Sequence, residues 1–166
     1  MALRRNSRAA TPPWPDNPLL AAILKKENWG SMSIHRYHAL IDRLCEQLSI
    51  EVKPAMYQAA QIEVDGVGFT LFHAGLMLSD SVHMHCDFGA LPGAAREAVL
   101  LRLLETQTHL FGVCAPVFTY DRVRDSVALM CRFPLNEEAD AASTLELLRF
   151  FSGLAKRWRQ DRFTFV

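Results

Sequence analysis

The stretch "SVHMHCDFG", Ser81 to Gly89, alternates apolar and polar residues. This period of two predicts a β-strand, because successive side chains of an extended chain point to opposite faces of a sheet. The apolar side chains, which we expect to face the core, are Val82, Met84, Cys86 and Phe88. The polar side chains on the other face are His83, His85 and Asp87. The strand is therefore expected to be half-buried, and what its polar face contacts becomes the question of function.

Two segments before this strand have the same alternation, "AAQIEVDG" at residues 59–66 and "VGFTLFHAG" at residues 67–75. Asp65 and Gly66 separate them and form a typical two-residue hairpin turn. The linker "LMLSD" then leads into the quoted strand. The three segments together predict an antiparallel meander.

A second hairpin is predicted in residues 116–135, "PVFTYDRVRDSVALMCRFPL". Its turn lies at Arg124 and Asp125, and Pro134 ends it because proline cannot donate to a strand ladder. The apolar stripe of its second strand consists of Val127, Leu129, Cys131 and Phe133.

Three segments have apolar residues spaced as on one face of an α-helix, residues 33–48, 91–112 and 141–160. The second segment is apolar over a wider arc than the roughly 100 degrees that packing on one sheet requires. Each leucine left in water would forgo about 1.5–3 kcal/mol of burial. A second copy of the chain is the simplest cover for these leucines, so we expect a homodimer.

The predicted order is helix, three strands, helix, two strands, helix. Helices and strands are segregated rather than alternating, which is typical of an α+β fold. We therefore expect an antiparallel sheet covered by helices, in a protein that forms a homodimer.

Size and composition favour one domain with one core, since the chain has 166 residues, of which 50% are hydrophobic and 22% charged. Its apolar runs are far shorter than the roughly 20 residues of a membrane-spanning helix, and none fits a signal peptide. We expect a cytoplasmic protein without a membrane span. The widely spaced cysteines are expected to be reduced core residues rather than disulfides or zinc ligands. They are Cys45, Cys86, Cys114 and Cys131.

Residues 1–31 contain "TPPWP" and "PDNP" and have no sustained periodicity, so we predict a flexible extension there. The predicted domain is residues 32–166, with Met32 as a candidate start directly before the expected helix N-cap, Ser33. The extension carries a surplus of three positive charges although the whole chain has a formal net charge of zero. The domain is thus mildly acidic, which argues against binding to nucleic acid.

The two histidines of the quoted strand, His83 and His85, raise the possibility of a metal site. Such a site needs a third ligand, and the available donors are His73, Glu63 and Asp87. We prefer to interpret the histidines as part of a polar outer face. The chain has no G-x-S-x-G motif and no glycine-rich phosphate loop. We therefore expect a binding protein rather than an enzyme, with no catalytic residue, no metal and no cofactor.

The ordered segments resemble those of the Tir-chaperone (CesT-like) family of type III secretion chaperones, from Ser33 to Arg162. "ALIDRLCEQLSI" is similar to the family's first helix, "IEVDGVGFTLFH" to its first hairpin, and "VHMHCDFGALP" to its third strand and the turn that follows. "LLRLLETQTHLFG" is similar to the second helix, "VALMCRFPL" to the fifth strand, and "LLRFFSGLAKRWRQ" to the closing helix. The order and spacing of these segments carry the resemblance.

The resemblance implies a protein from the cytoplasm of a Gram-negative bacterium that binds the N-terminal region of a secreted effector. Such a chaperone keeps that region extended and competent for secretion until the ATPase of the secretion machine releases it. It also implies a homodimer joined through the second helix and the fourth strand. The expected dimer contacts are Leu100, Leu101, Leu104, Phe118 and Tyr120.

The alternating strands then indicate where an extended effector chain would lie, on the sheet face that the core residues leave outward. Phe72 and Met130 are the main expected contacts, and Leu40, at the edge of the first helix's apolar arc, extends the patch. The full set of expected effector contacts is Leu40, Gly68, Thr70, Phe72, His83, His85, Ala128 and Met130.

One alternative stays open at this point, a non-chaperone dimeric α+β domain that regulates or binds metal. Stoichiometric zinc or nickel, lost when His83 and His85 are both replaced by alanine, would favour it.

Overall fold

The computed structural model describes residues 18–74, 80–110, 114–135 and 140–163, with the backbone alone for residues 18–31. In chain order the elements are α1 (Pro18–Leu48), the short 3-10 helix η1 (Pro54–Tyr57), β1 (Ala60–Val64), β2 (Val67–His73), β3 (Ser81–Ala90), α2 (Arg96–Leu110), β4 (Val117–Asp121), β5 (Ser126–Pro134) and α3 (Ala141–Asp161). The predicted order of helices and strands and the α+β class are confirmed.

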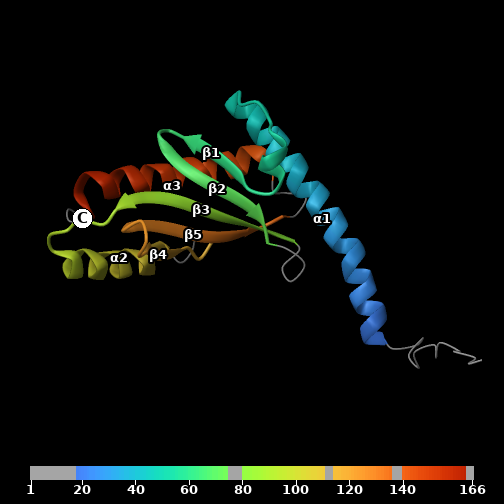
Figure 1. Ribbon diagram of the computed structural model, residues 1–166, viewed down its shortest axis with the longest axis horizontal. Coiled ribbons are helices and arrows are strands. Elements are labelled where there is room, and N and C mark those ends of the chain that lie inside the picture. The colour runs from blue at the N-terminus through green and yellow to red at the C-terminus, as the bar shows by residue number, and fades with distance from the viewer. Residues whose placement is uncertain (1–17, 75–79, 111–113, 136–139, 164–166) are drawn as a thin grey trace, which may run out of the picture.

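The strands form one antiparallel sheet in the order β1-β2-β3-β5-β4 (Figure 1). The central strand is β3, which pairs with β2 on one side and β5 on the other. The quoted stretch therefore lies in the middle of the sheet. A register shift between Asp87 and Gly89 bends the end of β3, and Gly89 adopts a positive φ of 96° there.

One face of the sheet, the inner face, forms the core. It carries the alternate apolar residues of the strands, which are buried, and α3 packs across it with α1 alongside (Figure 1). From α3, Leu148, Phe151 and Trp158 are fully buried. Burial of each such side chain contributes about 1.5–3 kcal/mol, so this contact stabilises the fold. The predicted core stripes of the strands are confirmed.

Both ends of α3 are fixed by hydrogen bonds. The side chain of Asp140 accepts one from the backbone N–H of Ser143 at 2.6 Å, as a helix N-cap does. Near the other end, the guanidinium of Arg159 donates to three backbone carbonyls, of Gly66 at 3.0 Å, Asp87 at 2.9 Å and Phe88 at 3.3 Å. These bonds tie α3 to the β1–β2 turn and to the end of β3.

The first helix begins at Pro18 rather than at the expected Ser33, so the backbone of residues 18–31 is helical. A proline suits the first position of a helix, and the residues that follow, "LLAAILKKE", are strong helix formers. Ser33 is a buried residue within α1 whose hydroxyl contacts His73 Nε2 at 3.0 Å. The first 17 residues lie outside the described part of the chain. No helix in the described residues is long and apolar enough to cross a membrane.

Candidate functional site

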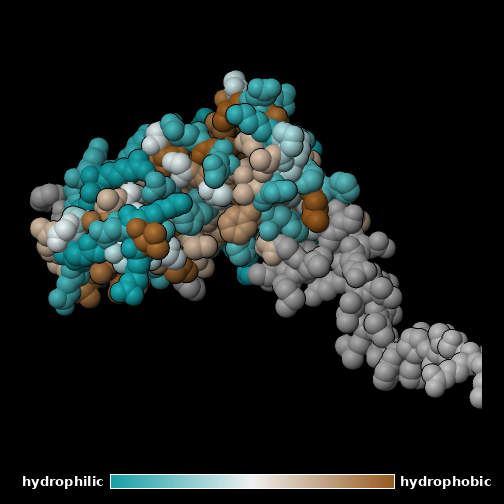
Figure 2. Space-filling model, in the orientation of Figure 1, coloured by the Kyte–Doolittle hydropathy of each residue, from teal (hydrophilic) through white to brown (hydrophobic). Residues whose placement is uncertain are grey.

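The sheet face opposite the core is its outer face. In the described part of the chain, α1 and α3 lie on the inner side and leave the outer face open (Figure 1). The strand registers define one row across all five strands, consisting of Gln61, Thr70, His85, Met130 and Val117. A second row consists of Phe72, His83 and Arg132. The visible side of the domain mixes hydrophilic and hydrophobic residues instead of forming one apolar sheet of surface (Figure 2).

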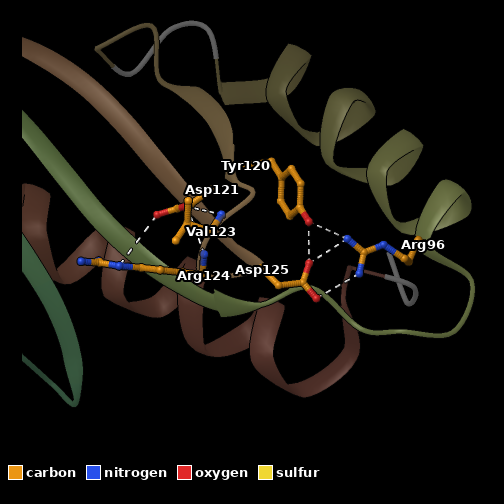
Figure 3. A network of polar contacts seen from close by, with 6 residues as sticks. All are labelled: Arg96, Tyr120, Asp121, Val123, Arg124 and Asp125. Carbon is orange, nitrogen blue, oxygen red and sulfur yellow. Dashed lines mark hydrogen bonds and ion pairs between the residues drawn. The ribbon is translucent and has the colours of Figure 1, made fainter.

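A polar hollow of about 610 Å³ lies on the outer face beside the long row. Small residues, Gly68 and Ala128, line it and leave room above the strands. Its charged lining residues are Glu63, Asp87, Asp121 and Arg124. The carboxylate of Asp121 accepts hydrogen bonds from the backbone N–H groups of Arg124 and Val123, which lower its pKa (Figure 3). This hollow suits polar groups of a bound molecule.

An apolar hollow of about 590 Å³ lies toward the other end of β5. Met130 and Val117 line it together with His83. The ring of His83 also lies against Phe72, with their centroids 5.2 Å apart. Its Nε2 atom is buried and has no hydrogen-bond partner among the described residues, which costs about 1–3 kcal/mol.

A second apolar surface lies on α2. Leu100, Leu101 and Leu104 expose 37%, 55% and 60% of their area, and we call these three residues the leucine ridge. Other exposed apolar side chains occur on β4 and in the turn after it: Val117, Tyr120 and Val123. The side chain of Gln107 on α2 accepts a hydrogen bond from the backbone N–H of Phe118 on β4 at 2.9 Å. The helix is thus held against the edge strand with its leucines outward.

A polar cluster joins the start of α2 to the β4–β5 turn (Figure 3). The guanidinium of Arg96 donates to both carboxylate oxygens of Asp125, at 2.7 and 3.1 Å, and to the Tyr120 hydroxyl at 2.7 Å. The Tyr120 hydroxyl donates to Asp125 at 2.6 Å. These bonds lower the pKa of Asp125 to about 2, with the bond from Arg96 as the largest cause, and they raise the pKa of Arg96. The cluster positions Tyr120 and α2 relative to each other.

Comparison with known families identifies the chain. The family model of the Tir chaperone protein (CesT) family matches residues 40–159. The chain belongs to this family. The prediction of a type III secretion chaperone is therefore confirmed at the level of the family. The comparison with curated protein sequences finds no match.

Solved structures have the same fold as this CesT-family chain. A chain of the ExsC–ExsE complex is 14% identical with a TM-score of 0.60, covering 74% of this chain and 90% of that one. A chain of the HopA1–SchA chaperone–effector complex is 13% identical with a TM-score of 0.60, covering 78% and 97%. A chain of the ExoT–SpcS complex from Pseudomonas aeruginosa is 19% identical with a TM-score of 0.51, covering 75% and 96%. At sequence identities of 13–19%, this structural similarity establishes the fold alone.

Seven of the eight expected effector contacts of this CesT-family protein lie on the outer face: Gly68, Thr70, Phe72, His83, His85, Ala128 and Met130. Ala128 is only 5% exposed, so it offers little area of its own. Leu40 does not belong to this set, because it is 3% exposed and lies in the core. The reason is that α1 packs against both α3 and η1, which buries a wider arc of the helix than one contact would.

Among the expected dimer contacts, the three leucines of the ridge and Tyr120 are exposed, whereas Phe118 is not on that surface. Phe118 pairs with Leu129 across the sheet and shares its inner face. Its ring stacks edge to face on Phe88, with the centroids 5.2 Å apart. Phe118 is therefore placed as a core contact of β4.

The described residues contain no cluster of three or more histidines, cysteines or acidic residues arranged to hold a metal ion. His83 and His85 are two positions apart on β3, and the His83 ring packs against Phe72. The Arg96 cluster was not foreseen, because no sequence pattern links the start of a helix to a turn 29 residues later.

Proposed function

We propose that this type III secretion chaperone holds an extended segment from the N-terminal region of an effector against its outer sheet face, and that it does so as a homodimer. The observation that carries the proposal is the open five-stranded face, with Phe72 and Met130 between polar neighbours. An extended chain lying across strands can place alternate side chains into hollows, as peptide-binding sheets do. The related ExsC–ExsE and HopA1–SchA structures are themselves complexes.

The chemistry of the face supports an extended and poorly structured partner. Met130 is flexible and fits irregular apolar groups, and Phe72 offers apolar area beside the His83 ring. The His83 ring, which lines the apolar hollow, adds flat contact area for the bound segment. The polar hollow around Asp87, Asp121 and Arg124 is suited to the polar side chains of the same segment.

The homodimer is supported by the leucine ridge. Three leucines within five positions of one helix expose 37% to 60% of their area, more apolar surface than a solvated helix usually carries. A twofold interface uses the same patch on both subunits, so each leucine of the ridge is buried once on each subunit. The proposed interface consists of the ridge and Tyr120.

The family resemblance supports two further parts of the proposal. The chaperone acts in the cytoplasm of a Gram-negative bacterium, and the ATPase of the secretion machine releases the effector from it. Neither part of the proposal requires catalysis by the chaperone.

The test begins with co-purification from the native bacterium, where mass spectrometry identifies the bound effector. The purified chaperone is then combined with the N-terminal region of that effector, and light scattering measures the mass of the complex. We expect a chaperone dimer bound to the effector region. A monomeric chaperone, or one that never retains an exported protein, would contradict the proposal.

The matched variants are Phe72→Asp and Phe150→Asp. Both remove an apolar ring, but Phe150 lies on α3, is 47% exposed and is remote from the outer face. We expect Phe72→Asp to lose the effector region and Phe150→Asp to keep it, both as dimers. Equal recovery with the two variants would place the effector elsewhere.

A further inference from the structure

The polar cluster of Arg96, Tyr120 and Asp125 holds an exposed aromatic ring in one place. Tyr120 is 39% exposed. Its hydroxyl accepts a hydrogen bond from the Arg96 guanidinium at 2.7 Å and donates one to the Asp125 carboxylate at 2.6 Å (Figure 3). The same guanidinium lies over the Tyr120 ring, 5.6 Å from its centroid. Both the hydroxyl and the ring are therefore fixed, although the side chain is partly exposed.

The residues that hold Tyr120 are themselves fixed by the frame of the domain. The backbone carbonyl of Asp125 accepts a hydrogen bond from the N–H of Leu91, a buried residue directly after β3, at 3.0 Å. The two carboxylate oxygens of Asp125 accept bonds from two different nitrogens of Arg96. Such a bidentate pair fixes the orientation of both side chains as well as their distance. The β4–β5 turn and the start of α2 are thus joined through Tyr120.

The periodicity of α2 places this cluster beside the leucine ridge. Leu100 and Leu104 follow Arg96 at steps of four residues, so the three lie along one side of the helix. Farther along that side, Gln107 accepts a hydrogen bond from the β4 backbone. The ridge therefore borders β4 between two side-chain bonds to that hairpin. Tyr120 extends the apolar surface of the ridge at its Arg96 end.

Support of the fold is a weak explanation for the cluster. The side chains of Arg96 and Asp125 are 38% and 54% exposed. An ion pair at such exposure adds little to the free energy of folding, because water screens it and two long side chains lose freedom. Its geometric effect on Tyr120 does not depend on that small net stability. The cluster is therefore better explained by the ring position that it sets.

We propose that Arg96 and Asp125 are positioning residues of the dimer surface, which hold Tyr120 beside the leucine ridge before a second copy of the chain binds. The inference rests on the proposed homodimer. A side chain already ordered in the free subunit loses little further freedom on association, so more of its contact energy appears as affinity. A second copy is the partner that fits, because a twofold axis brings the same ridge and ring together from both subunits.

The test uses the full chain and measures the dissociation constant of the dimer by light scattering over a dilution series. Arg96→Ala frees the Tyr120 side chain and should raise this constant about tenfold. Arg102→Ala is the matched control, because it removes another exposed ion pair of α2, that with Glu105 at 3.0 Å. It should leave the constant within about twofold of the unaltered protein. Equal dissociation constants for the two variants would overturn the proposal.

A double-mutant cycle separates positioning of the ring from support of the helix. In a Tyr120→Ala background, Arg96→Ala should change the dissociation constant by less than about twofold, because the ring that Arg96 positions is absent. If Arg96 acted only by stabilising α2, its effect would be the same in both backgrounds. Additive effects of the two substitutions would therefore overturn the proposal.

A milder variant, Tyr120→Phe, decides the question if Arg96→Ala does not fold by circular dichroism. It keeps the ring and the Arg96–Asp125 pair and removes only the hydroxyl that both residues bind. The dissociation constant should rise about threefold. A constant equal to that of the unaltered protein would overturn the positioning role and leave the homodimer standing. A monomeric unaltered protein would instead overturn the homodimer, and this inference with it.

Discussion

The outer sheet face and the leucine ridge both expose apolar side chains, but they differ in kind. The ridge presents three leucines on one helix, whereas the outer face sets Phe72 and Met130 among polar residues and two hollows. A uniform apolar ridge suits one constant partner of the same shape, such as a second copy. A mixed, hollowed face suits an extended chain with varied side chains. The difference indicates that the two surfaces serve different partners and can be lost separately.

The largest expected effect is on the ridge. Leu101→Glu places a charge on the proposed interface twice, once from each subunit, and removes two buried leucines at about 1.5–3 kcal/mol each. The dissociation constant of the dimer should rise by about 100-fold or more, measured by light scattering over a dilution series. Phe150→Glu, at a similarly exposed apolar residue on α3, is the control and should leave the dimer intact. An unchanged dimer in Leu101→Glu would rule out the ridge as the interface.

The next effect is on the outer face. Met130→Asp puts a charge in the apolar hollow and should weaken binding of the effector region about tenfold or more, measured by calorimetry. The dimer mass should not change. If Met130→Asp dissociates the dimer instead, the outer face takes part in the dimer interface, and the outer face and the leucine ridge do not serve separate partners.

A smaller effect is expected at His83. His83→Phe removes the unpartnered buried nitrogen while keeping a flat ring against Phe72, so the free energy of unfolding should rise by about 1 kcal/mol. His85→Phe is the control for adding an apolar ring to the same strand. Equal stability changes in both variants would show that the His83 nitrogen carries no special cost.

The smallest effect is a pH dependence at Asp125. Its folded-state pKa of about 2 is below the ordinary value of 3.8, so its contribution to stability is present above pH 3.8 and is lost as the pH falls toward 2. The melting temperature of Asp125→Asn should therefore lie slightly below that of the unaltered protein at pH 7 and equal it near pH 2. Asp65→Asn, at another exposed turn aspartate with positive φ, controls for the substitution itself. A difference that persists undiminished at pH 2 would exclude the ion pair as its source.

Much of this fold follows from local patterns. The period of two in Ser81 to Gly89 correctly identified both faces of β3, because a sheet buried on one side forces polar residues to the other. The same alternation placed most of the expected effector contacts on one face. It also identifies Phe118 as an inner-face residue, since Phe118 pairs with the core residue Leu129, although the family resemblance implied a dimer contact there.

Other features depend on packing that no local pattern contains. Leu40 lies at the edge of an apolar arc, and only the presence of neighbours on both sides of α1 decides that it is buried. The bonds from Arg96 to Asp125 join segments separated in the chain. The early start of α1 at Pro18 is a different case. The helix-forming residues after Pro18 can be recognised in the sequence, but the prolines before them led to the prediction of a flexible segment.

The three bonds of Arg159 have a consequence for biosynthesis. The carbonyl of Gly66 receives its donor from a residue 93 positions later, and the carbonyls of Asp87 and Phe88 receive theirs from the same guanidinium. The hairpins leave the ribosome long before that donor exists. These three bonds therefore form only after Arg159 has been translated, so the final packing of α3 on the sheet is a late, long-range step of folding.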